Sequence, residues 1–184
     1  MDVRARQEFE EFVTARSAAL FRTAVLLTGN RQDAQDLVQS ALERACRHWD
    51  RVAVAEQPEA YVRRILVNSL KDRWRSRRRI VEVSFDDARP ELQAGPSPYR
   101  QVDLRRSMIG ALQRLPVGMR SVLVLRYFED LTEAEIARTL NCSAGTVKSQ
   151  AARGLARLRS SLGPHLGPDA DQEAVIRLLP GGDS

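Results

Sequence analysis

Residues 132–159 read TEAEIARTLNCSAGTVKSQAARGLARLR, a stretch that predicts two short helices joined by a tight turn. Thr132 and Glu135 have the spacing of a capping box, in which each side chain accepts a hydrogen bond from the other residue's backbone amide. Asn141 suits the left-handed conformation that ends a helix, and Ser143 suits the N-cap of the next helix. The stretch is therefore predicted to be a helix-turn-helix.

The second helix of this pair has an apolar face and a polar face. At about 100° per residue, the apolar residues gather on one side, namely Val147, Ala151, Leu155 and Leu158. The other side and its flanks carry small, polar and basic residues: Thr146, Lys148, Ser149, Gln150, Ala152, Arg153 and Arg157. Such a face suits the major groove of DNA, where arginine and lysine pair with guanine or phosphate and glutamine pairs with adenine. The alternative interpretation is an ordinary helical hairpin with a solvated basic face.

The whole chain is predicted to be all-α, because apolar residues recur at spacings of three and four over most of its length. In the first half, helices are expected near residues 9–27, 33–48 and 58–79. Arg16 interrupts the apolar stripe of the first helix, so its guanidinium is expected to extend into water. The predicted organisation is a first helical domain, 5–79; a flexible, proline-rich linker, 80–100; a second helical domain, 101–161; and a tail, 162–184.

The most cationic window is residues 61–79, which has eight arginines and lysines against one acidic residue, Asp72. On a helical wheel, one side is apolar and the opposite side carries Tyr61, Arg64, Asn68, Lys71 and Arg75. An exposed asparagine amide can hydrogen-bond an unstacked base, and stacking of a base on an aromatic ring contributes about 1 to 3 kcal/mol. The alternative is a phosphate-binding or merely solvated face, with Trp74 in the core.

Composition favours a nucleic-acid partner and argues against several other classes of protein. The 184 residues have a formal net charge of +5, and the basic residues are clustered, which favours a polyanionic ligand. Cys46 and Cys142 stand apart without a CxxC motif, and Cys46 with His48 supplies only two metal ligands, so we expect no disulfide framework, metal site or cofactor. No apolar run approaches about 18 residues and the start of the chain does not resemble a signal peptide, so we expect a cytoplasmic protein without membrane insertion.

Several short segments occur together in a fixed order along the chain. They are DAQDLVQ at 33–39, YVRRILVN at 61–68, LP at 115–116, LRYF at 125–128, EIA at 135–137 and GTVKS at 145–149. In this order, with a linker between the second and the third, they resemble a bacterial sigma factor of the extracytoplasmic-function type, group IV of the sigma-70 family. Gln150 departs from the resemblance, since many relatives carry arginine at that position.

The resemblance implies a fold and a function. The first domain is then sigma region 2, which binds core RNA polymerase and melts and captures the minus-10 promoter element. The second domain is sigma region 4, which reads the minus-35 element as duplex DNA. Together the two domains direct promoter-specific transcription initiation as a binding factor and not as an enzyme. The implied partners are core RNA polymerase, promoter DNA and an anti-sigma factor.

The helical faces and the resemblance together assign candidate site residues. The polymerase-binding residues are Asp33, Asp36, Gln39 and Glu43. The minus-10 residues are Tyr61, Arg64, Asn68, Lys71 and Arg75, and the resemblance places Asn68 where it helps to capture a flipped non-template base. The minus-35 residues are Thr146, Lys148, Ser149, Gln150, Arg153 and Arg157.

Two other functions remain open on the sequence. A free-standing repressor or activator would share the helix-turn-helix but would normally dimerise on a palindromic site, and it would bind DNA tightly without polymerase. A metal-dependent nuclease could use Asp33, Asp36 and Glu43. Those carboxylates fit a surface stripe, however, and no inward-facing cluster of carboxylates or histidines accompanies them.

Overall fold

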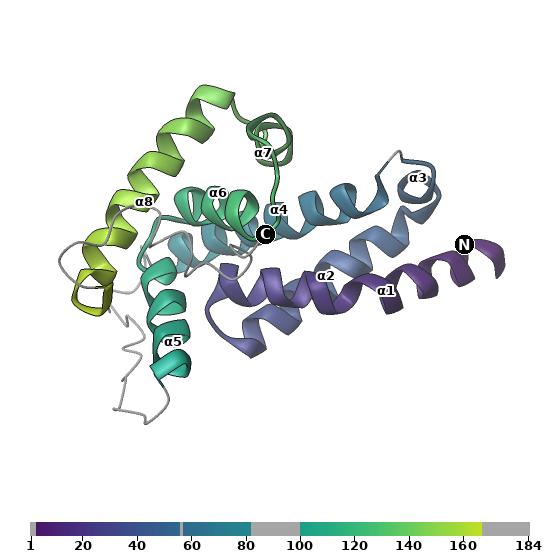
Figure 1. Cartoon of the computed structure of the whole chain (residues 1–184). Coiled ribbons are helices and arrows are strands. Elements are labelled where there is room, and N and C mark those ends of the chain that lie inside the picture. Colours follow the sequence, from purple (N-terminus) through teal and green to yellow (C-terminus); the bar gives the residue numbers. More distant parts are fainter. Residues whose placement is uncertain (1–2, 56, 82–99, 167–184) are drawn as a thin grey trace. The chain divides into compact units, whose positions relative to one another are not determined.

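The computed structural model describes residues 3–55, 57–81 and 100–166, and every regular element in these ranges is an α-helix (Figure 1). In chain order these are α1 (Val3–Thr28), α2 (Arg31–Arg47), α3 (Trp49–Ala53), α4 (Pro58–Val81), α5 (Arg100–Gln113), α6 (Val117–Tyr127), α7 (Glu133–Leu140) and α8 (Ala144–Leu166). The prediction of an all-α fold is confirmed. The short helix α3 was not predicted.

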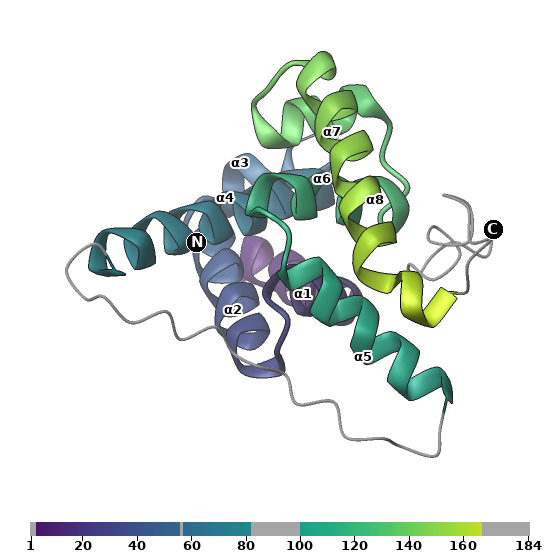
Figure 2. The ribbon, with the colours of Figure 1, turned by 90° about the vertical axis from the view of Figure 1, so that its left-hand side faces the viewer.

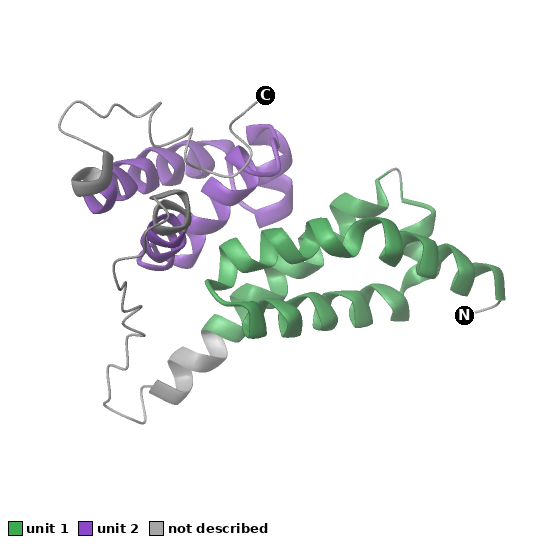
Figure 3. Ribbon diagram, turned by 60° about the horizontal axis from the view of Figure 1, so that its bottom comes forward, with its two compact units in different colours: residues 1–75 green, residues 76–184 purple. Residues whose placement is uncertain are grey.

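The chain divides into two compact units, residues 1–75 and 76–184 (Figure 3). This division agrees with the expectation of two small helical domains. Most of the predicted linker, and most of the predicted tail, lie outside the described residues. The exact domain boundaries, 5–79 and 101–161, stay predictions.

In the first unit, α1 and α2 pack along each other and α3 packs against both. Gly29, with a φ of 87°, ends α1 in a left-handed conformation that glycine tolerates best. The apolar stripe of α2, which follows the spacing of three and four, is buried at Ala34, Leu37, Val38, Ala41 and Ala45, and half-buried at Leu42. Trp49 of α3 is buried against α1, where its ring contacts Phe9 and Phe12 at centroid distances of 5.1 and 5.2 Å. Aromatic packing of this kind stabilises α3, which has too few residues to be stable as an isolated helix.

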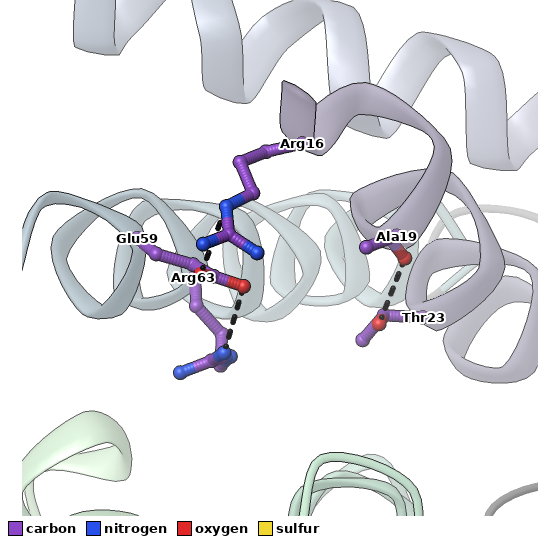
Figure 4. A network of polar contacts seen from close by, with 5 residues as sticks. All are labelled: Arg16, Ala19, Thr23, Glu59 and Arg63. Carbon is purple, nitrogen blue, oxygen red and sulfur yellow. Dashed lines mark hydrogen bonds and ion pairs between the residues drawn. The ribbon is translucent and has the colours of Figure 1, made fainter. Parts of the chain in front are cut away.

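Arg16 reaches the surface as expected, and there its guanidinium pairs with a carboxylate of another helix. Its Nε lies 3.2 Å from Oε2 of Glu59 in α4, and Oε1 of Glu59 lies 3.4 Å from a guanidinium nitrogen of Arg63 (Figure 4). The Arg16 side chain is still 51 % exposed, so the pair lies at the surface. In the same view, the buried Thr23 hydroxyl donates to the Ala19 carbonyl at 3.2 Å, which satisfies this polar group within α1.

In the second unit, α8 packs against α5, α6 and α7. Residues 121–125 of α6 are all buried, so α6 forms the centre of this core. Arg120, only 5 % exposed, donates to the Leu115 carbonyl at 3.2 Å and to the side chain of Gln113. Burial lowers the pKa of Arg120 to about 10, so this guanidinium remains charged at neutral pH. It thereby joins the end of α5 to the start of α6.

The helix-turn-helix forms as predicted (Figure 2). The Thr132 amide donates to the Glu135 carboxylate at 2.8 Å, and the Glu135 amide donates to the Thr132 hydroxyl at 3.3 Å, which completes the capping box. Asn141 has φ 52° and ψ 57°, and Ser143 accepts from the Thr146 amide at 3.1 Å. The second helix is longer than predicted, since α8 continues to residue 166, because the buried Leu162 extends its apolar stripe.

Candidate nucleic-acid interface

The outward face of α4 carries the predicted combination of amide, cation and aromatic ring. Arg64 and Asn68 are exposed, whereas Tyr61 and Lys71 are half-buried. The Arg64 guanidinium lies 5.6 Å from the centroid of the Tyr61 ring, within the range of a cation–π contact. The opposite side is apolar and buried at Val62, Leu66 and Leu70, with Trp74 half-buried. The side chain of Arg75 lies outside the described part of the structure.

Other cations at α4 make contacts that join α4 to α2. Arg73 donates to the Asp36 carbonyl at 2.9 Å and to the Ser40 hydroxyl at 3.0 Å, which ties α4 to α2. Arg44 of α2 crosses in the other direction: it donates to the Ser69 hydroxyl at 3.3 Å and lies 3.7 Å from the Asp72 carboxylate. The charge count over residues 61–79 therefore includes at least one cation, Arg73, that bonds within the first unit.

The helical register of α4 separates an arginine that bonds to α2 from one on the outward face. Arg73 follows Val62 by eleven residues, which places the two about 20° apart around the helix axis. Arg64 lies about 200° from Val62 by the same count. Arg73 therefore belongs to the edge of the buried stripe, whereas Arg64 belongs to the outward face.

The predicted polymerase-binding residues of α2 fall into two groups, one exposed and one in the N-terminal cap of the helix. Asp36, Gln39 and Glu43 are exposed, and Gln39 donates to the Glu43 carboxylate at 3.0 Å. Asp33 belongs to the N-terminal cap of α2, because its backbone amide donates to Asn30 Oδ1 and its carboxylate accepts from Asn30 Nδ2, both at 2.8 Å. The sequence did not predict this local role of the Asp33 carboxylate.

An open apolar groove of about 680 Å³ runs between α1 and α2. Its apolar lining includes Phe9, Val13, Phe21, Val38 and Leu42, and its polar lining includes Gln39 and Glu43. Half of the predicted polymerase-binding residues thus border an apolar surface. The sequence did not predict this groove.

On α8, the predicted apolar and polar faces are both present. Val147, Ala151, Leu155 and Leu158 are buried. Of the predicted minus-35 residues, Lys148, Arg153 and Arg157 are exposed, and Thr146 and Ser149 are half-buried. The Thr146 and Ser143 hydroxyls lie 2.9 Å apart, and the Ser149 hydroxyl donates to the Thr146 carbonyl at 3.1 Å. The first turn of α8 is therefore well ordered by its own polar groups.

Gln150 differs from the other residues on this face, because its side-chain carbonyl points to α6. Its Oε1 is buried and has no hydrogen-bond partner among the described residues. A Cβ on Gly118 would lie 2.8 Å from that oxygen, so the amide rests on the glycine backbone. In this conformation the Gln150 carbonyl is turned away from the outward face, and a contact with adenine would require the side chain to rotate. No pattern in the sequence indicates the Gly118 contact.

Three observations concern metal binding, the cysteines and membrane-spanning helices. Within the described residues, no three His, Cys, Asp or Glu side chains gather closely enough to hold a metal ion. Cys46 and Cys142 are half-buried free thiols. Among the helices in the described ranges, none has the length and apolarity needed to cross a membrane.

Comparisons with known proteins identify the family of the chain. Residues 12–80 match the model of Sigma-70 region 2, and residues 105–158 match that of Sigma-70, region 4. The RNA polymerase sigma-E factor of Streptomyces avermitilis is 41 % identical over 170 residues, which cover 92 % of each chain. The ECF RNA polymerase sigma factor SigM of Mycobacterium tuberculosis is 30 % identical over 158 residues, which cover 86 % of this chain and 79 % of the relative.

A solved structure agrees with these matches. The sigma factor RpoE from Bartonella quintana, solved with the anti-sigma factor NepR, superposes with a TM-score of 0.72 at 26 % identity, and the match covers 85 % of this chain and 97 % of that one. Both sigma regions, the helical fold and the full-length relatives lead to one assignment. The chain belongs to the extracytoplasmic-function class of the sigma-70 family, whose members are non-enzymatic subunits that direct RNA polymerase to initiate transcription at specific promoters.

Proposed function

We propose that this sigma factor contacts two promoter elements with two different helices, α4 at minus-10 and α8 at minus-35, while α2 binds core RNA polymerase. The observation that supports this most directly is that the outward polar faces of α4 and α8 belong to separate compact units. A protein with one reading surface would need only one such unit. Residues 5–79 are then region 2, residues 101–161 are region 4, and residues 80–100 link them.

At minus-10, α4 is proposed to trap an unstacked base of the non-template strand. The exposed Asn68 amide supplies hydrogen bonds to the base edge, and the Tyr61 ring with the Arg64 guanidinium supplies a stacking surface. Lys71 and Arg75 would hold the backbone phosphates. Exposing a base costs a few kcal/mol, and stacking returns about 1 to 3 kcal/mol, so capture shifts the melting equilibrium without chemical catalysis.

At minus-35, α8 is proposed to enter the major groove of closed duplex DNA. Thr146 and Ser149 in its first turns are small enough to let the helix backbone approach the base edges. Lys148, Arg153 and Arg157 extend from the exposed side and would pair with phosphates or guanines. Gln150 would join them only after leaving Gly118.

On the polymerase side, the exposed carboxylates and amide of α2 are proposed to contact the core enzyme. Asp36, Gln39 and Glu43 present this polar surface, and Asp33 fixes the helix N-terminus that begins it. The neighbouring apolar groove provides area for hydrophobic contact. By analogy with RpoE, which was solved with NepR, we also propose that this chain has an anti-sigma factor as a partner.

The test adds purified chain to sigma-free core RNA polymerase, for example that of Streptomyces coelicolor, whose sigma-E factor is 38 % identical to this chain. Initiation on genomic fragments is then compared for the parent, Asn68→Ala and Arg153→Ala. Asn68→Ala should impair promoter opening more than closed-complex binding, and Arg153→Ala should do the reverse. Arg159→Ala, an exposed arginine of α8 outside the predicted contacts, is the matched control.

Three results would count against the proposal. Absence of initiation on every genomic fragment would refute the assignment of function. Equal effects of Asn68→Ala and Arg153→Ala on opening and binding would refute the division of roles. Tight, sequence-specific binding of a palindrome by the chain without polymerase would favour a free-standing regulator.

A further inference from the structure

We propose that Glu133 is a positioning residue for the minus-35 interface. Its carboxylate holds the Lys148 ammonium in the free protein and releases it to a DNA phosphate on binding. This inference rests on the proposed function of α8. Glu133 lies in the first turn of α7, outside the residues that the sequence assigned to DNA. It would set the strength of the phosphate contact without touching DNA itself.

The geometry brings three helices together at the Glu133 carboxylate. Its Oε1 lies 3.0 Å from a guanidinium nitrogen of Arg126 in α6, and that contact is also a hydrogen bond. Its Oε2 lies 3.6 Å from Nζ of Lys148 in α8. The carboxylate thus has one short, directional partner and one looser partner, and the looser one is a predicted DNA contact.

The exposures of these side chains favour release of Lys148 and not of Arg126. The Lys148 side chain is 68 % exposed, whereas those of Arg126 and Glu133 are 35 % and 29 % exposed. An ammonium at 3.6 Å on a flexible, exposed stem can move to another anion with little loss. The planar guanidinium at 3.0 Å is held in place more firmly.

The negative charge of the Glu133 carboxylate would still have a cationic partner after Lys148 leaves. Its carboxylate keeps the Arg126 pair, and its position in the first turn of α7 places it near the positive end of the helix dipole. The transfer therefore exchanges one anionic partner of Lys148 for another and leaves no isolated anion. The Glu133 carboxylate lowers the net gain from the phosphate contact, because Lys148 must give up one partner to reach the other.

The experiment measures closed-complex affinity of the holoenzyme for a promoter fragment that supports initiation, under conditions that keep the duplex closed. Because exposed ion pairs are weak, Glu133→Gln should tighten binding by about two- to fivefold at low salt, and by less at high salt. Asp130→Asn removes the same charge from a nearby exposed site, and asparagine tolerates the left-handed φ of 49° there. This control should tighten binding by less than half as much.

A double-mutant cycle separates positioning from a structural role. The effect of Glu133→Gln should vanish in a Lys148→Gln background, since Glu133 is argued to act through Lys148. Equal tightening in that background, tightening no greater than that of Asp130→Asn, or weaker binding would overturn the inference. If Arg153→Ala also left closed-complex binding unchanged, the proposed reading of minus-35 by α8 would fail, and the inference with it.

Discussion

The two helices proposed to contact DNA, α4 and α8, are both basic and amphipathic, yet their cations are used differently. In α4, Arg63 pairs with Glu59, and Arg73 bonds to α2, so these cations stabilise the first unit. In α8, Arg153 and Arg157 are exposed. The comparison shows that the orientation of each cation relative to the buried stripe, and not the number of cations, determines what a helix offers to DNA.

The outward faces also differ in shape. The face of α4 is built from an aromatic ring, a guanidinium and an amide, which are groups that stack on and bond to a base outside a duplex. The face of α8 begins with the small residues Thr146, Ser149 and Ala152, which let a helix enter a groove closely. The proposed roles of single-strand capture and duplex reading therefore call for different side chains, although both helices are basic.

The largest expected effect tests whether the two units are independent. Leu66 of α4 and Leu158 of α8 are both fully buried, so replacing either by alanine should lower the free energy of unfolding by about 2 to 5 kcal/mol. Leu66→Ala should shift the unfolding transition of the first unit, and Leu158→Ala that of the second. Hydrogen exchange of the full chain, followed residue by residue, measures both. A loss of protection in both units from either substitution would contradict independence.

A smaller effect distinguishes an arginine of α4 that bonds to α2 from one that is exposed. Arg73→Met removes the bonds to the Asp36 carbonyl and the Ser40 hydroxyl, so it should lower the free energy of unfolding by about 1 to 2 kcal/mol. Arg64→Met is the matched variant on the exposed face and should change stability by less than about 0.5 kcal/mol.

The two substitutions should have the opposite order of effect on promoter opening. Arg64→Met should slow promoter opening in the transcription assay, whereas Arg73→Met should affect opening only as far as it unfolds the first unit. Denaturant titration and opening kinetics on the same samples make the comparison. Equal destabilisation by both substitutions would show that the register of α4 does not separate structural from outward cations.

The sequence predicted those features that depend on neighbouring residues. The capping box, the Asn141 turn and the apolar faces of α2 and α8 each arise from residues within a few positions of one another, and all are present. It did not predict features that join distant segments: the ring contacts of Trp49, the Arg16–Glu59 pair and the Gln150–Gly118 contact. Helical periodicity locates a face but does not identify the residue that packs against it.

The helix-turn-helix provides a third prediction, because a capping box begins α7. Thr132→Ala removes the hydroxyl that accepts from the Glu135 amide, so the free energy of unfolding of the second unit should fall by about 1 kcal/mol. Thr132→Ser keeps the hydroxyl and should recover most of the loss. Thermal unfolding of the full chain measures both, and equal losses would show that the cap hydrogen bond contributes little.

The smallest expected effect asks whether α8 can add Gln150 to its outward face. Gly118→Ala places a methyl group where the Gln150 amide now rests, so the amide must move, and the end of a flexible side chain can move at little cost. Alanine is favoured over glycine in a helix by roughly 0.5 to 1 kcal/mol, so the second unit should be slightly stabilised.

Displacement of Gln150 should also change what the minus-35 helix reads. An outward amide can make two hydrogen bonds to adenine, so Gly118→Ala should increase the preference for adenine at one minus-35 position, and Gln150→Ala should remove that gain. Selection of minus-35 sequences with the holoenzyme measures the preference. Gly154→Ala is the contrasting variant: its Cβ would lie 2.9 Å from the buried Leu123, so it should destabilise the core without altering the adenine preference. An unchanged preference in Gly118→Ala would mean that Gln150 packs against α6 and takes no part in reading the promoter.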